Sequence, residues 1–260
     1  MPYKLPPETQ IIAHRGNSGP APENTPSAIE QAIELGVDMV EVDVRLSREG
    51  IPVLIHHPTL EQTTNGHGRV DQHTLAELKR LDAGSWKGPQ FAGERILTLP
   101  ECLELARGRV ALNLDLKTGR AIPAISKAVR EMNAIDEVVI TGCTWNSVKA
   151  IRAGESHLTV LLNVDRIINF LACTGSATLF RTGYLAEART LAPDGLNMDQ
   201  RYVDQQLVEA AHRRGLSVWT WTVDDEIRLQ TLIDLGVDSI STNWPARMLR
   251  VMNRNPGWRE

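Results

Sequence analysis

Residues 39–46 read M-V-E-V-D-V-R-L, so that Glu41 and Asp43 alternate with valines. Successive side chains of a β-strand point to opposite faces, and this segment therefore carries two carboxylates on one face and apolar side chains on the other. The preceding residues 28–35, A-I-E-Q-A-I-E-L, have the spacing of an amphipathic helix that ends at Gly36, a residue suited to the left-handed C-terminal position. The order of helix, glycine turn and buried strand indicates an α/β fold.

The same alternation of strands and helices continues along the chain. The turn L-G-V-D-S at 235–239 repeats L-G-V-D-M at 35–39. Besides 39–46, apolar runs predict strands at 11–13, 111–116, 137–141, 158–162, 195–198, 216–221 and 239–242. Eight strands that alternate with helices predict a (β/α)8 TIM barrel, with 1–260 as a single domain. Residues 57–97 are rich in turn residues, and we expect them to form a small inserted cap subdomain after the second strand.

The composition is that of an ordinary globular protein. Of 260 residues, 42% are hydrophobic and the net charge is −4, with basic residues scattered, so we expect no nucleic-acid partner. No apolar run reaches the roughly 18 residues of a membrane span, and the first ten residues do not resemble a signal peptide. Cys102, Cys143 and Cys173 are widely separated and predict buried thiols in a reducing compartment, which we expect to be the cytoplasm.

Chemically active side chains follow several predicted strands, at the end of a barrel where active sites lie. His14 and Arg15 follow the first strand, Asp115 and Lys117 end the third, and His56 ends an extended run at 51–55. The inward carboxylates would repel one another strongly unless a cation lay among them. Oxygen-only ligands favour a hard divalent ion, Mg²⁺ or Ca²⁺. The metal ligands predicted in this way are Glu41, Asp43 and Asp115.

A purely structural alternative stays open, in which Glu41 and Asp43 form salt bridges with Arg15 and Lys117. The presence of two histidines at the same rim favours catalysis, because one basic and one protonated imidazole can move protons on both sides of a phosphorus atom. The two cations would then neutralise phosphate charge.

Three local patterns leave a choice open. In V-L-I-H-H at 53–57, strand alternation places His56 and His57 on opposite faces, so that only one of them faces the chemistry. Trp219 and Trp221 share a face and either line the barrel mouth or fill the interface between barrel and helices. Residues 163–181, which include Phe170 and Phe180, predict only a loop or short helix near the mouth.

Taken together, several motifs resemble the glycerophosphodiester phosphodiesterases of the phospholipase C-like phosphodiesterase superfamily. They occur in order over residues 11 to about 250, which is nearly the whole chain. They are H-R-G (14–16), P-E-N-T (22–25), E-V-D-V-R-L-S-R-E-G-I-P-V-L-I-H (41–56), T-T-N-G-H-G (63–68), L-D-A-G-S-W (81–86), L-D-L-K (114–117), W-T-V (221–223) and L-G-V-D-S-I-S-T (235–242).

This resemblance implies roles for the candidate residues. His14 and His56 are implied as the acid–base pair, and the three carboxylates as ligands of one divalent cation, Mg²⁺ or Ca²⁺ with Mn²⁺ as a third option. Arg15 and Lys117 would contact the phosphate, Trp221 the substrate's glycerol, and 57–97 would cover one side of the cleft.

The implied reaction hydrolyses a small-molecule glycerophosphodiester, such as glycerophosphocholine or glycerophosphoethanolamine, to an alcohol and sn-glycerol 3-phosphate. The alternatives are a lysophospholipase D-like activity on lysophospholipids and a non-catalytic barrel that binds phosphodiesters.

The chain departs from the family pattern at three positions. His57 stands where aspartate is usual, Asp115 replaces the commoner glutamate, and Asn243 replaces an aspartate, at what we expect to be a structural turn. The first two affect the expected metal preference and pH optimum more than the reaction class.

Overall fold

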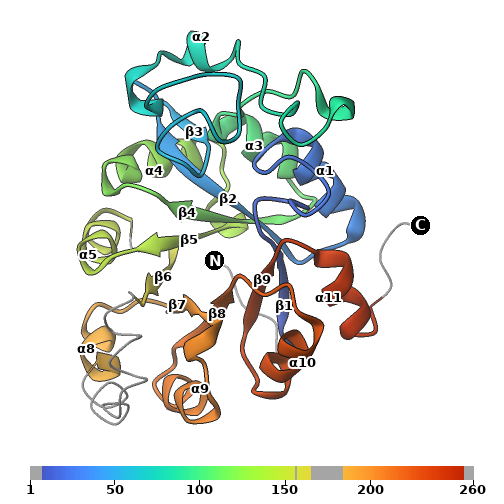
Figure 1. The fold of residues 1–260 in the computed structure, drawn as a ribbon. Helices are drawn as coiled ribbons and strands as arrows, with labels where there is room; N and C mark the ends of the chain where they lie inside the picture. The colour runs from blue at the N-terminus through green and yellow to red at the C-terminus, as the bar shows by residue number, and fades with distance from the viewer. Residues whose placement is uncertain (1–7, 156, 165–183, 255–260) are drawn as a thin grey trace.

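The computed structural model describes residues 8–155, 157–164 and 184–254. Within these ranges, eight parallel strands form a closed sheet in which β1 pairs with both β2 and β9 (Figure 1). The barrel strands are β1 (Gln10–Ala13), β2 (Met39–Leu46), β4 (Ala111–Leu116), β5 (Val138–Cys143), β6 (Thr159–Asn163), β7 (Gly195–Asp199), β8 (Ser217–Trp221) and β9 (Ser239–Thr242). The predicted (β/α)8 TIM barrel is confirmed, and each strand overlaps its predicted range.

Helices surround the barrel (Figure 1). At the end of two of them, Gly36 and Gly236 adopt the left-handed conformation (φ 75° and 74°) that the repeated turn predicts. None of the described helices is long and apolar enough to cross a membrane. The helices are α1 (Pro26–Leu35), α3 (Leu99–Ala106), α4 (Ile122–Glu131), α5 (Trp145–Gly154), α8 (Leu185–Thr190), α9 (Gln205–His212), α10 (Glu226–Asp234) and α11 (Pro245–Val251).

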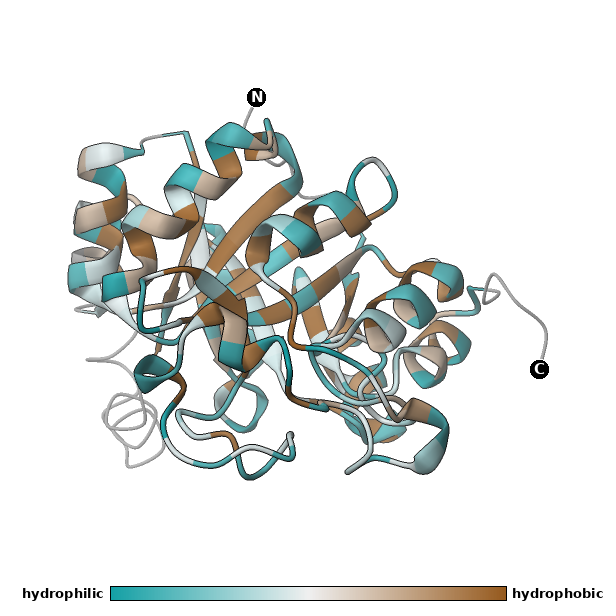
Figure 2. Cartoon of the chain, turned by 90° about the horizontal axis from the view of Figure 1, so that it is seen from above, coloured by the Kyte–Doolittle hydropathy of each residue, from teal (hydrophilic) through white to brown (hydrophobic). Residues whose placement is uncertain are grey.

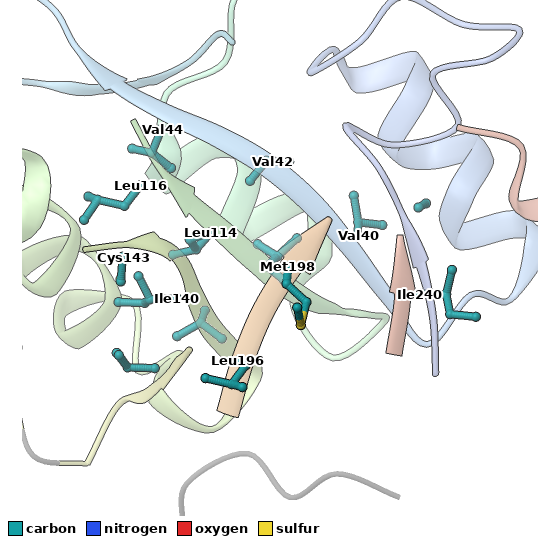
Figure 3. Packing of buried hydrophobic residues seen from close by; sticks show 14 of the residues in the cluster. Val40, Val42, Val44, Leu114, Leu116, Ile140, Cys143, Leu196, Met198 and Ile240 are labelled. Atoms are coloured by element: carbon teal, nitrogen blue, oxygen red, sulfur yellow. The ribbon is translucent and has the colours of Figure 1, made fainter. Parts of the chain in front are cut away.

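The outer face of the barrel is apolar and packs against these helices. Val40, Val42 and Val44 of β2 lie beside Leu114 and Leu116 of β4 in one continuous core (Figure 3). Burial of each such side chain contributes about 1.5–3 kcal/mol to stability. Figure 2 shows the result as largely hydrophobic central strands surrounded by helices of mixed hydropathy.

The inner face of the barrel changes character along the strands. At the N-terminal end it holds a small apolar cluster of Ile12, Met39, Val139, Leu161 and Trp219. Further along the same inward faces the side chains become polar: β2 continues from Met39 to Glu41 and Asp43, and β4 from Ala111 to Asn113 and Asp115. The polar end is therefore the C-terminal end, where the sequence predicts the site.

The segment after β2 returns along the sheet edge and then leaves the barrel. β3 (Pro52–Leu54) pairs antiparallel with β2, and the following residues hold only short helices: η1 (Val70–Gln72), α2 (Leu75–Leu78) and η2 (Pro89–Phe91). Figure 1 shows this insertion, in teal, at the upper edge of the molecule. It has an apolar cluster of its own, formed by Val53, Ile55, Leu60, Val70, Leu78, Ala83 and Ile96.

Part of the predicted loop at 163–181 lies outside the described residues, together with Phe170, Phe180 and Cys173. Asn163 ends β6, and Val164 is buried beside it.

Candidate active site

A cavity of about 360 Å³ opens at the C-terminal end of the barrel. Its walls come from nearly every strand, so a substrate in it would touch residues far apart in sequence. The lining residues are His14, Arg15, Glu41, His56, Asn113, Asp115, Leu116, Lys117, Thr141, Gly142, Asn163, Asn197, Trp221, Thr222 and Ser241.

Two carboxylates of the cavity lining, those of Glu41 and Asp115, meet a third, that of the buried Asp43. Glu41, Asp43 and Asp115 each place an oxygen within 4.8 Å of the others. Burial, followed by the charges of the two aspartates, raises the pKa of Glu41 well above its ordinary value. Glu41 Oε1 is buried and has no hydrogen-bond partner among the described residues. An all-oxygen cluster with an unpartnered buried oxygen suits a hard divalent cation, so these residues could hold one.

Two cations lie against the same cluster. Lys117 Nζ is 2.7 Å from Asp43 Oδ1 and also contacts Asp115, while Arg15 Nε is 3.2 Å from Asp43 Oδ2. Burial would raise the pKa of Asp43, but Lys117 and Arg15 lower it below the usual range. The salt-bridge alternative thus describes Asp43 well. It does not describe Glu41, whose side chain has no Lys or Arg within ion-pair distance among the described residues.

The H-R-G turn directs Arg15 into the site. Arg15 adopts a left-handed conformation (φ 57°), and its backbone N–H donates to Glu41 Oε2 at 2.8 Å. Its guanidinium donates to both oxygens of Glu23, at 2.9 and 3.0 Å. The next residue must be glycine, because a Cβ on Gly16 would lie 2.6 Å from the Ala28 backbone. The turn therefore binds one carboxylate through its backbone and two others through its side chain.

Asn24 holds Asp43 in place, a contact that sequence reasoning missed. Its Nδ2 donates to Asp43 Oδ2 at 2.8 Å, and its Oδ1 accepts the backbone N–H of Asp43 at 3.0 Å. Asn24 has φ 61°, a conformation that asparagine tolerates better than most residues. The sequence places Asn24 shortly before the first helix, but this position alone does not indicate which residue the side chain binds.

His14 is oriented by a residue from the far end of the chain. Its Nδ1 lies 2.7 Å from Asn243 Oδ1, and Asn243 Nδ2 donates to Asp224 Oδ2 at 2.7 Å. Since the amide donates to Asp224, its oxygen accepts a hydrogen bond from the His14 Nδ1–H, so that Nε2, 3.9 Å from Glu41 Oε2, carries no proton and can act as a base. Burial, followed by the charge of Arg15, lowers the pKa of His14 to about 4. Asn243, predicted to serve only a turn, therefore contacts a candidate catalytic group.

His56 reaches the cavity from the first residues after β3. Burial lowers its pKa to about 3, and the charge of Arg15 adds to that effect. Its carbonyl accepts two hydrogen bonds from the Arg45 guanidinium, at 2.9 and 2.7 Å.

His57 does not line this cavity, but its ring lies edge-on to that of His56, with centroids 4.5 Å apart. The prediction that the two rings lie on opposite faces is wrong, because strand β3 ends at Leu54 and strand alternation no longer applies. Both rings also place a nitrogen within 4.8 Å of a Glu23 oxygen.

The two tryptophans of β8 both lie inside the barrel, at different depths. Trp219 is buried in the apolar cluster at the base, and Trp221 lines the cavity. Neither belongs to the core between barrel and helices, so that alternative does not hold.

Gly142 is a further residue of the site that sequence reasoning missed. It has φ 68°, and a Cβ there would lie 2.0 Å from Asp115 Oδ1. The absence of a side chain at this position makes room for the carboxylate.

Residues 14–247 match the glycerophosphoryl diester phosphodiesterase family. The chain belongs to this family. A glycerophosphodiester phosphodiesterase of Caldanaerobacter subterraneus is 36% identical over 253 residues, which cover 95% of this chain and 99% of the relative. One of Bacillus altitudinis is 30% identical and covers 94% and 98% of the two chains. The predicted family and the predicted class of enzyme are thereby confirmed.

Solved structures of the family have the same architecture. A phosphodiesterase of Oleispira antarctica, in complex with the product sn-glycerol-3-phosphate, superimposes with a TM-score of 0.84 at 31% identity and covers 96% of this chain and 97% of its own. A Thermotoga maritima glycerophosphodiester phosphodiesterase, at 22% identity and a TM-score of 0.74, shares the fold over 95% of this chain and 99% of its own.

Proposed function

We propose that this chain hydrolyses glycerophosphodiesters, such as glycerophosphocholine or glycerophosphoethanolamine, to an alcohol and sn-glycerol 3-phosphate in the presence of a divalent cation. The observation that carries the proposal is the meeting of two imidazoles, three carboxylates and two cationic side chains around one cavity of about 360 Å³. The product bound in the related Oleispira structure supports the choice of substrate class.

Each group in the cavity has a role that its surroundings favour. Lys117 and Arg15 stay protonated and would bind the nonbridging oxygens of a phosphodiester. A cation held by Glu41, Asp43 and Asp115 would polarise phosphate and lower the pKa of a glycerol hydroxyl beside it. Trp221 would form a wall against the glycerol.

The imidazoles would move the protons. The neutral His14 Nε2 accepts the proton of the attacking glycerol hydroxyl, and a cyclic phosphate forms as the P–O bond to the alcohol breaks. His56 supplies the proton that the departing alcohol needs, since the negative charge of the bound diester opposes the depression of its pKa. Water then opens the ring, with the two roles reversed.

The insertion and the compartment complete the proposal. Residues 57–97 would cover one side of the cleft, and Lys87 ties them to the loop after β1 by donating to the Ser18 carbonyl at 2.8 Å. Cys102 and Cys143 are buried free thiols, which suits the reducing cytoplasm.

A substrate panel on metal-stripped protein tests the proposal. Mg²⁺, Ca²⁺ or Mn²⁺ is added back singly, and release of sn-glycerol 3-phosphate from glycerophosphocholine and glycerophosphoethanolamine is measured beside the melting temperature. We expect turnover with at least one ion and a rise in melting temperature that the variant Glu41→Gln largely loses.

The alternative functions predict other outcomes. Thermal stabilisation by the ions without any turnover would indicate a non-catalytic binding barrel. Faster choline release from lysophosphatidylcholine than from glycerophosphocholine would indicate a lysophospholipase D.

A further inference from the structure

We propose that the alcohol side of this site recognises a head group that carries a second negative charge, in particular a phosphate. The inference rests on the proposed function and concerns a second, basic cavity of about 200 Å³ beside the first. Lys117 lines both cavities, so the second begins where the phosphodiester phosphate is expected to lie. The residues that matter in it are Arg45, Arg69, Asp71 and Arg120.

The topology places this cavity on the side of the leaving alcohol. In the closed ring of eight strands, β8 lies four strands away from β4 in either direction, so Trp221 and Lys117 belong to opposite sides of the barrel mouth. A substrate with its glycerol against Trp221 and its phosphate at Lys117 therefore extends its alcohol toward the rim at β2 and β4. The basic cavity occupies that rim, between the strand ends and the insertion.

The cavity has more positive than negative charge. Arg69 donates to both oxygens of Asp71, each at 2.9 Å, and Arg120 lies 3.3 Å from the same carboxylate. Arg45 has no carboxylate within ion-pair distance in the part of the chain that the structure describes, and its guanidinium donates to the His56 carbonyl. The cavity thus contains three guanidiniums and only one carboxylate, in a chain whose net charge is −4.

A phosphate complements this arrangement better than other head groups. Guanidinium groups bind phosphate oxygens in pairs through their fixed fork of donors. The side chains of Arg69 and Arg120 are 52% and 75% exposed, so an incoming head group can reach them. The same charges oppose the quaternary ammonium of choline.

Two matched substrates test the inference: glycerophosphoglycerol, whose alcohol is neutral, and the same molecule with a terminal phosphate. Glycerophosphocholine, whose alcohol is cationic, is the third substrate. For the wild type we expect the highest kcat/KM on the phosphate-bearing substrate, with a preference that weakens as salt shortens the range of electrostatic attraction.

Two sets of variants change the charge of the cavity in opposite directions. The double variant Arg69→Gln/Arg120→Gln should lower kcat/KM on the phosphate-bearing substrate about 5- to 30-fold and raise it on glycerophosphocholine. Asp71→Asn should increase the preference for the phosphate-bearing substrate. Arg213→Gln is the matched control, because Arg213 pairs with Glu209 at the end of α9, on the opposite end of the barrel, and should leave all three values unchanged.

The outcomes separate the two proposals. A double variant that leaves the ratio between substrates unchanged, or that lowers all three values equally, overturns the anionic subsite while the phosphodiesterase proposal stands. Failure of the wild type to cleave any of the three substrates with any of the cations overturns the phosphodiesterase proposal itself.

Discussion

The base and the mouth of the barrel interior are built from the same strand faces but from opposite kinds of residue. The base holds Ile12, Val139 and Trp219 in a dry apolar cluster, whereas the mouth gathers three carboxylates at the next inward positions along β2 and β4. Burial at the base stabilises the fold, while burial at the mouth raises the pKa of Glu41 and costs stability. Two or four residues along one strand thus separate a structural role from a chemical one.

The largest effect of the mouth should come from its imidazoles. His14→Ala or His56→Ala should lower kcat about 10²- to 10⁴-fold, because each removes one proton carrier. Denaturation curves should stay close to those of the wild type, since neither ring belongs to an apolar cluster. Activity near that of the wild type in either folded variant would remove that residue from the catalytic pair.

At the base the expected effect is on stability. Trp219→Ala leaves a cavity in a cluster that excludes solvent, and the free energy of unfolding in urea should fall by about 3–5 kcal/mol. Trp221→Ala, two residues further along the same face, is the matched variant and should raise KM while destabilising the protein less. If the two substitutions destabilise equally, the division between base and mouth does not hold.

Much of this division is readable from the sequence, because it follows from local patterns. The alternation in 39–46 and the repeated L-G-V-D turn depend on residues a few positions apart, and the structure contains both. These local patterns predict where the strands lie, and the strands position the carboxylates.

What the sequence did not predict depends on contacts between distant segments. Asn243 meets His14 across 229 residues, and Asn24 meets Asp43 across 19. The periodicity of apolar residues along the sequence does not indicate which distant residues form such contacts. The alternation argument for His56 and His57 was wrong for a related reason: the pattern held only as far as β3 itself, which ends at Leu54.

A more moderate change should follow from moving one charge at the mouth. The double variant Asp224→Asn/Asn243→Asp exchanges an amide and a carboxylate that are hydrogen-bonded to each other, so one of each remains. A carboxylate beside His14 Nδ1 favours the protonated ring, and we expect the pKa of His14 to rise from about 4 by roughly one unit.

Because the protonated ring cannot act as a base, the acidic limb of the kcat/KM profile should move to higher pH by the same amount. If the acidic limb stays at the same pH in a folded, active double variant, a group other than His14 determines that limb.

The smallest effect is expected at His57. The ring of His57 contacts His56 but does not line the cavity, so the activity of His57→Asp should stay within about threefold of the wild type. The activity of His56→Asp should fall about 10²-fold or more, because a proton carrier is missing. Both variants are assayed with the same cation and compared by melting temperature. An inactive but folded His57→Asp protein would assign the proton transfer to His57 instead.

The bond between His14 and Asn243 also bears on when the enzyme becomes active. All three carboxylates and Lys117 belong to the first 117 residues, but the partner that orients His14 follows β9, which is the final strand to pair with β1. Contacts between such distant segments form slowly, because a long loop must close first. His14 can therefore be held by Asn243 only when β9 has paired with β1 and the ring of strands has closed.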